Sequence, residues 1–338
     1  MRGLRIKTTL FLAVAFSAAV SPCLARGIFS SDGFCRVPDG VEEIYSKGLK
    51  HLAATQTAAG CWNGGYGGEP GVVGLCVIAM LAHGDDPNYG PYASNIKRGI
   101  NYILSRANKS NGYIGSSMYN HGFATLALAE SFGAVDDPRI GPMLEKAVGL
   151  ILTSQASNPM KAWRYGPTSN DADTTVSGAC FVALIAAANA GIKVPDKAIK
   201  DALAYYARCQ SEDGGFGYTG PGGSDLPRTA IGTLVYSLAR KTNSNVYKRS
   251  HEYIVSRDSG QIMNCSYPYY YLYYASQAFF RSPSAKVWNG WNALNIKRLQ
   301  ALQIQDGGWR GQNGSAFSTA AALLSLALNY RFLPIYER

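Results

Sequence analysis

The chain has 338 residues, of which 47% are hydrophobic, and a formal net charge of +10. This length is enough for one large domain, and no low-complexity linker divides it. The lysines and arginines are scattered and form no basic stripe with base-stacking aromatics, so the composition argues against nucleic-acid binding.

The N-terminal segment predicts an exported protein. Arg2, Arg5 and Lys7 precede an apolar run at residues 9–20, and small residues lead to Ala25. This is the pattern of a secretory signal peptide, and no later run is long enough to cross a membrane. We therefore expect a signal peptide at residues 1–25, an N-terminal extension at 26–40 and the folded domain at 41–338. The mature protein is expected in the periplasm or outside the cell, where its six remaining cysteines allow several disulfide pairings.

A short motif recurs along the folded domain. In each copy a glutamine is followed six residues later by an aromatic residue, with glycine two positions before the aromatic. The copies are residues 56–62, 210–216 and 303–309, and residues 155–163 form a looser fourth copy. Recurrence at a fixed spacing indicates a repeated supersecondary unit. We predict that each glutamine bonds neighbouring backbone groups and that each aromatic packs between hairpins, which is a structural role.

Each repeat is predicted to contain two helices and no strand. The first helix of each unit is amphipathic and the second is more apolar. Taken in chain order, the predicted first helices cover residues 41–52, 96–104, 143–152, 195–206, a short segment ending at 254, and 288–302. The predicted second helices cover residues 71–81, 119–132, 173–190, 225–239, 267–280 and 315–330.

The apolar second helices decide between two arrangements of the hairpins. Stacked hairpins form either an open solenoid or a closed ring. A helix that is apolar on every side, such as residues 72–81, should be covered by protein on both faces. An open solenoid would leave one of these faces in water. We therefore predict an all-α fold, an α6/α6 toroid of six helical hairpins with the second helices inside.

The repeats also resemble those of a known superfamily. They look like the QW motifs of squalene and oxidosqualene cyclases and the related repeats of protein prenyltransferase β subunits. Residues 118–130, 173–178, 269–275 and 288–292 resemble exported, single-toroid members of that superfamily. The resemblance covers nearly all of the chain from about Val41. It implies the toroid fold and leaves the activity open, because the superfamily hosts cyclases, prenyltransferases and proteins with no assigned reaction.

The resemblance implies one set of catalytic candidates. Class II terpene cyclases carry a D-x-D-D motif whose middle aspartate protonates an alkene or epoxide. Asp171 and Asp173 match the first and middle positions, and Thr174 replaces the final aspartate. If the chain is such an enzyme, Asp173 is the proton donor, and Asp171 and His121 adjust its acidity.

Helix capping is the alternative role for Asp173. Ser117, Asp173 and Asp225 stand at equivalent positions before three of the predicted second helices. All three are residue types that accept backbone N–H bonds at a helix start. A lone histidine such as His121 is likewise more often structural than functional.

Candidate ligand-binding residues lie near the same helix starts. Asp225 and Arg228 are expected at the mouth of the ring, and Tyr119 begins another second helix. A tyrosine-dense segment offers a stripe that could line the central cavity and stack on an isoprenoid, a sugar or a developing cation, and this stripe comprises Tyr267, Tyr270, Tyr271 and Tyr274.

No metal or cofactor is predicted, because Asp225 is followed by Leu226 and Pro227 instead of the zinc ligands of prenyltransferases, and the histidines are isolated. Two functions remain open. The first is a binding or scaffold protein that holds an apolar small molecule, such as an isoprenoid, or a protein partner at the aromatic cavity. The second is a terpene-cyclase-like enzyme that uses Asp173. Export, the absent second toroid and the missing third aspartate favour binding.

Overall fold

A computed structural model describes residues 37–258 and 265–336 of the chain. The predicted signal peptide and most of the predicted N-terminal extension lie outside these residues, so the boundaries at 25 and 40 stay predictions. None of the described cysteines forms a disulfide with another described residue. None of the described helices has the length and apolar character needed to cross a membrane.

The described residues form twelve α-helices. The first helices of the six units are α1 (Val41–Thr55), α3 (Ala93–Ser105), α5 (Ile140–Ser157), α7 (Asp196–Cys209), α9 (Asn245–Arg257) and α11 (Ala285–Leu302). The second helices are α2 (Pro70–Leu81), α4 (Met118–Ser131), α6 (Thr174–Asn189), α8 (Leu226–Leu238), α10 (Pro268–Phe280) and α12 (Ser315–Ala327). A short 3-10 helix at Pro334–Tyr336 was not predicted.

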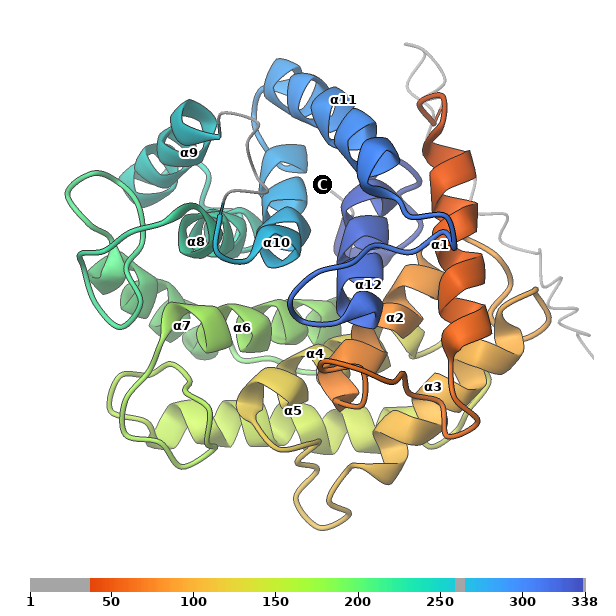
Figure 1. Ribbon diagram of the computed structural model, residues 1–338. Helices are drawn as coiled ribbons and strands as arrows, with labels where there is room; N and C mark the ends of the chain where they lie inside the picture. Colours follow the sequence, from red (N-terminus) through yellow and green to blue (C-terminus); the bar gives the residue numbers. More distant parts are fainter. Residues whose placement is uncertain (1–36, 259–264, 337–338) are drawn as a thin grey trace, which may run out of the picture. The chain divides into compact units, whose positions relative to one another are not determined.

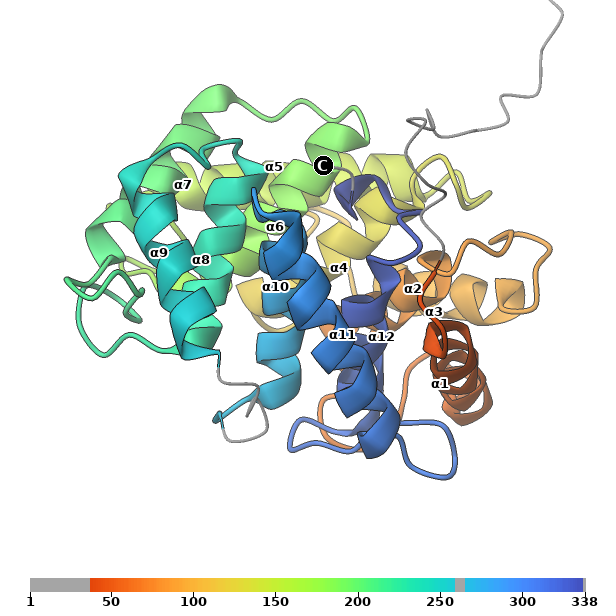
Figure 2. The ribbon, with the colours of Figure 1, turned by 90° about the horizontal axis from the view of Figure 1, so that it is seen from above.

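The six second helices form a closed inner ring. Each packs on the second helix of the next unit, from α2 through α4, α6, α8 and α10 to α12, and α12 packs back on α2. The first helices lie outside them, as α1, α9 and α11 do in Figure 1, and Figure 2 gives the same domain from above. The predicted α6/α6 toroid is therefore confirmed.

Burial explains which helix of each hairpin lies inside. All twelve residues of α2 are buried, because it packs between its ring neighbours and the outer layer. In α3, by contrast, the buried residues recur at helical spacing and the other face meets water. The apolar character of the second helices is thus a direct consequence of their two-sided packing.

The motif glutamines join four of the six units to the next unit. Gln303 donates from Nε2 to the Gly307 carbonyl in its own turn and to the Ile44 carbonyl of α1, both at 2.8 Å. The second of these bonds links the last repeat to the first and so helps to close the ring. The other three motif glutamines repeat this pattern, donating to carbonyls of α3, α7 and α9. The predicted structural role of the glutamines is confirmed.

The two ends of the ring differ. At the end where the inner helices finish, the C-terminal segment crosses the opening, and its residues Leu333, Ile335 and Tyr336 are buried. Tyr336 lies in the 3-10 helix, which packs against α6. At the other end, where the inner helices begin, a cavity is open to solvent.

Candidate functional site

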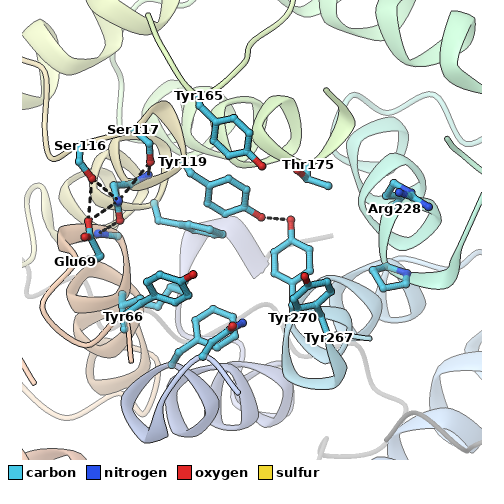
Figure 3. Close-up of a pocket in the computed structure, with 18 of the residues that line it drawn as sticks. Tyr66, Glu69, Ser116, Ser117, Tyr119, Tyr165, Thr175, Arg228, Tyr267 and Tyr270 are labelled. Carbon is cyan, nitrogen blue, oxygen red and sulfur yellow. Dashed lines mark hydrogen bonds between the residues drawn. The ribbon is translucent and has the colours of Figure 1, made fainter. Parts of the chain in front are cut away.

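The cavity at the starts of the inner helices has a volume of about 570 Å³. All six inner helices, or the residues just before them, contribute to its lining. Twenty residues line it. Eight of these are aromatic, namely Tyr66, Tyr119, Phe123, Tyr165, Tyr218, Tyr267, Tyr270 and Phe317. We refer to this space as the mouth cavity (Figure 3).

Two tyrosines close the floor of the mouth cavity. The Tyr119 hydroxyl of α4 donates a hydrogen bond to the Tyr270 hydroxyl of α10, across the centre of the ring (Figure 3). Phe123, one turn further along α4, packs edge-on against Tyr273 with ring centres 5.8 Å apart. Phe123 also lines the cavity and so completes its floor, and Tyr273 fills the ring beneath.

Exposed tyrosines surround the opening. Tyr66, Tyr165 and Tyr267 keep 58%, 48% and 51% of their surface exposed, although most large hydrophobic side chains of the domain are buried. The Tyr165 and Tyr218 hydroxyls lie 3.0 Å apart and hold these two rings side by side. Exposed aromatic side chains that gather around one opening indicate a binding surface. Single exposed aromatic residues scattered over a protein surface would not indicate one.

A carboxylate that the sequence analysis missed lies on the α2 side of the cavity. Glu69 Oε2 accepts hydrogen bonds from Asn120 Nδ2 at 2.6 Å and from Ser116 Oγ at 3.2 Å. Asn120 Oδ1 in turn accepts from the Gly71 backbone N–H. The cluster fixes the carboxylate at the cavity wall and joins the starts of α2 and α4 (Figure 3).

The predicted pair Asp225 and Arg228 lines the cavity on the α8 side. Asp225 Oδ1 caps α8 by accepting the Arg228 backbone N–H at 2.8 Å, and Oδ2 lies 2.9 Å from Arg228 Nη2. Burial raises the pKa of Asp225 above its ordinary value, while the backbone bond and the Arg228 charge act in the opposite direction. The pair therefore presents a fixed acceptor and a fixed donor at the mouth.

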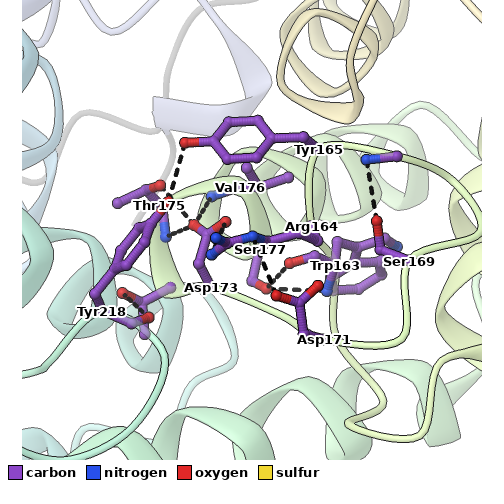
Figure 4. Close-up of polar contacts among 12 residues, drawn as sticks. Trp163, Arg164, Tyr165, Ser169, Asp171, Asp173, Thr175, Val176, Ser177 and Tyr218 are labelled. Carbon is purple, nitrogen blue, oxygen red and sulfur yellow. Dashed lines mark hydrogen bonds and ion pairs between the residues drawn. The ribbon is translucent and has the colours of Figure 1, made fainter.

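Asp173 caps α6 and lies outside the mouth-cavity lining. Its Oδ1 accepts from the backbone N–H groups of Thr175 and Val176, both at 2.8 Å, and its side chain is fully buried. Arg164 reaches Asp173 Oδ2 at 3.3 Å and the more exposed Asp171 at 3.4 Å (Figure 4). Burial raises the pKa of Asp173, although the cap bonds and Arg164 oppose this shift. The geometry accords with capping, and a catalytic role for Asp173 and Asp171 stays a prediction.

A pair of substitutions tests the capping role of Asp173. Asparagine can still accept the cap bonds, so Asp173→Asn should change the free energy of unfolding by less than about 1 kcal/mol. Asp173→Ala should lower it by about 1–2 kcal/mol more, because both variants lose the ion pair with Arg164 and only alanine also loses the cap bonds. Denaturant unfolding of both variants gives the comparison. Equal stability of the two would contradict the capping role.

His121 is a buried structural residue at the start of α4. Its Nδ1 accepts the Ile114 backbone N–H at 3.1 Å, and its Nε2 lies 3.0 Å from the Ala147 carbonyl of α5. Thr229 and Thr319 occupy equivalent positions of α8 and α12, and their hydroxyls accept the corresponding backbone N–H groups. The second repeat lacks the motif glutamine, and His121 supplies its link to the next outer helix. Its predicted part in catalysis remains untested.

The tyrosine stripe divides between two environments. Tyr267 and Tyr270 line the mouth cavity, whereas Tyr271 and Tyr274 are absent from its lining. Tyr271 is fully buried and donates to Asp258 Oδ2 at 3.0 Å, on the side of the outer helices. Tyr274 lies one turn below Tyr270, with ring centres 5.0 Å apart. The cavity ends above Tyr274, so only Tyr267 and Tyr270 of the predicted stripe line it.

Two other hollows lie at the ends of the inner helices, with volumes of about 710 and 490 Å³. The larger contains no aromatic residue in its lining, and both border the C-terminal segment near Pro334. Neither brings together the starts of the inner helices. The mouth cavity therefore remains the best candidate site of the described residues.

Comparison with known proteins identifies similar folds. No protein-family model and no curated protein matches the chain. A solved α-1,6-mannanase of Salegentibacter sp. HEL1_6, an inactive variant in complex with α-1,6-mannotetrose, is similar with a TM-score of 0.65 and 8% identity, over 86% of this chain and 99% of that chain. A family 76 glycoside hydrolase (mannosidase) from Bacteroides thetaiotaomicron has a TM-score of 0.61 and 10% identity, over 86% and 98%.

A type II terpene cyclase is also similar. The structure of MstE from Scytonema in complex with its product merosterolic acid A has a TM-score of 0.59 and 15% identity, over 87% of this chain and 98% of that chain. At such low identity these similarities support the α/α toroid fold alone. Two different chemistries occur on folds similar to this one, so the activity must be argued from the site.

Proposed function

We propose that this chain is a ligand-binding α/α toroid of the squalene-cyclase repeat type, and that its ligand occupies the mouth cavity. The observation that carries the proposal is the convergence of the inner helix starts on one open, aromatic-lined space. Ligand sites are typically concave and mostly apolar, with a few convergent polar groups. The mouth cavity combines these features, and Tyr119, Tyr267, Tyr270, Asp225 and Arg228 are the predicted contacts.

The ligand is expected to be amphipathic. Its body would lie on the aromatic floor, and its polar groups would meet the side chains around the opening. Two kinds of ligand from the comparisons have this character. MstE has been solved with geranylgeranyl dihydroxybenzoate, and the mannanase with α-1,6-mannotetrose. If the predicted signal peptide is used, this chain meets its ligand outside the cytoplasm.

A cyclase-like enzyme is the second candidate. The similarity to MstE and the raised pKa of the buried Asp173 carboxyl favour it, since an acid that protonates an alkene must stay protonated in a dry site. Two observations argue against it. The oxygens of Asp173 accept the backbone N–H groups at the start of α6 and contact Arg164, and Asp173 does not line the mouth cavity. We therefore favour binding.

Binding of Nile red, an uncharged aromatic fluorescent dye, tests the proposal. The dye should bind the mouth cavity of the purified chain. The double variant Tyr165→Ala/Tyr267→Ala should weaken this binding by about tenfold, because two of the exposed rings around the opening are removed. Tyr89→Ala is the matched control, since Tyr89 is 90% exposed and lies outside the lining.

Two results would count against the proposed site. The first is dye binding that the double variant leaves unchanged. The second is an equal loss in the double variant and in the Tyr89→Ala control. Either result would show that the tyrosines around the opening have no special part in binding.

A further inference from the structure

We infer that the ligand of the mouth cavity is a neutral carbohydrate and not a polyprenyl chain, an inference that rests on the ligand-binding function proposed above. Fourteen of the twenty lining residues carry a polar side-chain group. Besides the tyrosine rings, hydrocarbon surface comes from Val72, Leu75, Phe123 and Phe317. The lining thus combines apolar ring faces with groups that can form hydrogen bonds, the two kinds of surface that a sugar ring itself presents.

The cost of leaving polar groups without partners separates the two ligand classes. A hydrocarbon in this cavity would displace water from polar atoms that have no partner among the described residues, such as Glu69 Oε1, and would offer no hydrogen bond in return. Each buried polar group left unsatisfied costs about 1–3 kcal/mol. A sugar ring carries hydroxyl groups around its edge that both donate and accept, so it can replace the displaced water.

The depth of the cavity gives an independent reason. The bonded Tyr119 and Tyr270 hydroxyls and the Phe123 ring form the floor, and Tyr273 and Tyr274, which do not line the cavity, fill the space beneath. A long polyprenyl chain therefore finds no tunnel into the ring. A flat ring can instead lie against exposed tyrosine faces at the opening, with its C–H groups on the aromatic surface.

The charged groups favour a neutral ligand. Both polar contacts of the Glu69 carboxylate use Oε2, so Oε1 can accept from a ligand hydroxyl. On the opposite side, Arg228 uses Nη2 for the Gly223 carbonyl and for Asp225, and its Nε is buried, so Nη1 is the atom that can donate to a ligand. A phosphorylated ligand would face two carboxylates, Glu69 and Asp225, for this single arginine. Hydroxyl groups meet no such repulsion.

Displacement of Nile red, an uncharged dye, tests the ligand class on the purified chain. The probes are the linear tetrasaccharides of mannose, glucose and N-acetylglucosamine, with geranylgeraniol as the isoprenoid. We expect at least one tetrasaccharide to displace the dye. Calorimetry should then show binding of that sugar weakened by about tenfold in Glu69→Gln and in Tyr267→Ala, and unchanged in Tyr89→Ala. Thermal unfolding of each variant checks that it is folded.

Each other outcome overturns the inference. If geranylgeraniol displaces the dye and no tetrasaccharide does, the ligand class is wrong and the proposed binding function stands. The ligand class is also wrong, and the proposed binding function still stands, if neither the tetrasaccharides nor geranylgeraniol displace the dye while dye binding depends on Tyr165 and Tyr267. If a sugar binds equally well to wild type, Glu69→Gln and Tyr267→Ala, it binds elsewhere. Failure of the dye test itself would overturn both the ligand class and the proposed function.

Discussion

Replacement of Trp309 by alanine should lower the free energy of unfolding by about 3–5 kcal/mol. The indole is fully buried, and its Nε1 donates to the Leu299 carbonyl of α11 at 3.0 Å. The ring also lies against α1, where a methyl group added at Gly48 would come within 2.9 Å of it. The substitution would therefore open a cavity where the last repeat meets the first. Urea unfolding followed by circular dichroism measures the loss.

The chain offers a natural control for this experiment. Phe216 holds the same motif position in the fourth repeat and is also fully buried. Trp309→Phe should therefore cost clearly less than Trp309→Ala, since it keeps most of the packing and loses one hydrogen bond. If Trp309→Ala cost less than about 1 kcal/mol, the role assigned to the motif in closing the ring would be wrong.

Stability should also fall steeply in mild acid because of His121. Burial lowers the pKa of this histidine from 6.5 to about 4, because the charged imidazolium is poorly solvated there, while the hydrogen bond to the Ala147 carbonyl acts in the opposite direction. Protonation would place a second N–H against the Ile114 N–H. In the unfolded chain the histidine binds a proton below pH 6.5, whereas in the folded chain it does so only near pH 4. The contribution of His121 to the free energy of unfolding is therefore fully present above about pH 6.5. Roughly 3 kcal/mol of it is lost as the pH falls to 4.

The variant His121→Thr isolates this contribution. Threonine occupies the equivalent positions 229 and 319, where its hydroxyl accepts a backbone N–H. The variant should be less stable at neutral pH, since it leaves a cavity and loses the link to α5. Its free energy of unfolding should however fall less steeply between pH 6.5 and 4. Parallel pH profiles for wild type and variant would contradict the assigned environment of His121.

The fold could be predicted because its determinants repeat. The spacing of Gln56, Gln210 and Gln303 located the turns, and the apolar inner helices required cover on both faces. The closure of the ring is confirmed by the bond from Gln303 to Ile44, which joins residues 259 positions apart. No local pattern could have given the 3-10 helix at Pro334–Tyr336, since its burial depends on where the C-terminal segment meets the finished ring.

The candidate site was predicted only in part. Tyr119, Asp225, Arg228, Tyr267 and Tyr270 do line the mouth cavity, because inner helix starts converge there. The hydrogen bond between Tyr119 and Tyr270 at the floor of the cavity could not be predicted. That bond joins residues 151 positions apart and has no signature in either helix alone.

Two of the missed tyrosines had a signal in the sequence. Tyr165 and Tyr218 each follow a motif aromatic, Trp163 or Phe216, by two residues. Because each tyrosine lies two residues after a buried motif aromatic, both rings lie at the edge of the cavity, where their hydroxyls are in contact. Glu69 had no such signal, because its role depends on Asn120 from the neighbouring repeat.

Fluorine NMR would test most directly the claim that the mouth cavity binds the ligand. Fluorotyrosine placed at position 267 or, separately, at position 89 would report on the opening and on a distant exposed surface. During titration with Nile red, and then with the tetrasaccharide that displaces it, the resonance at position 267 should shift and saturate. The resonance at position 89 should stay unchanged. A ligand that binds by calorimetry but leaves the resonance at position 267 unmoved would contradict the account.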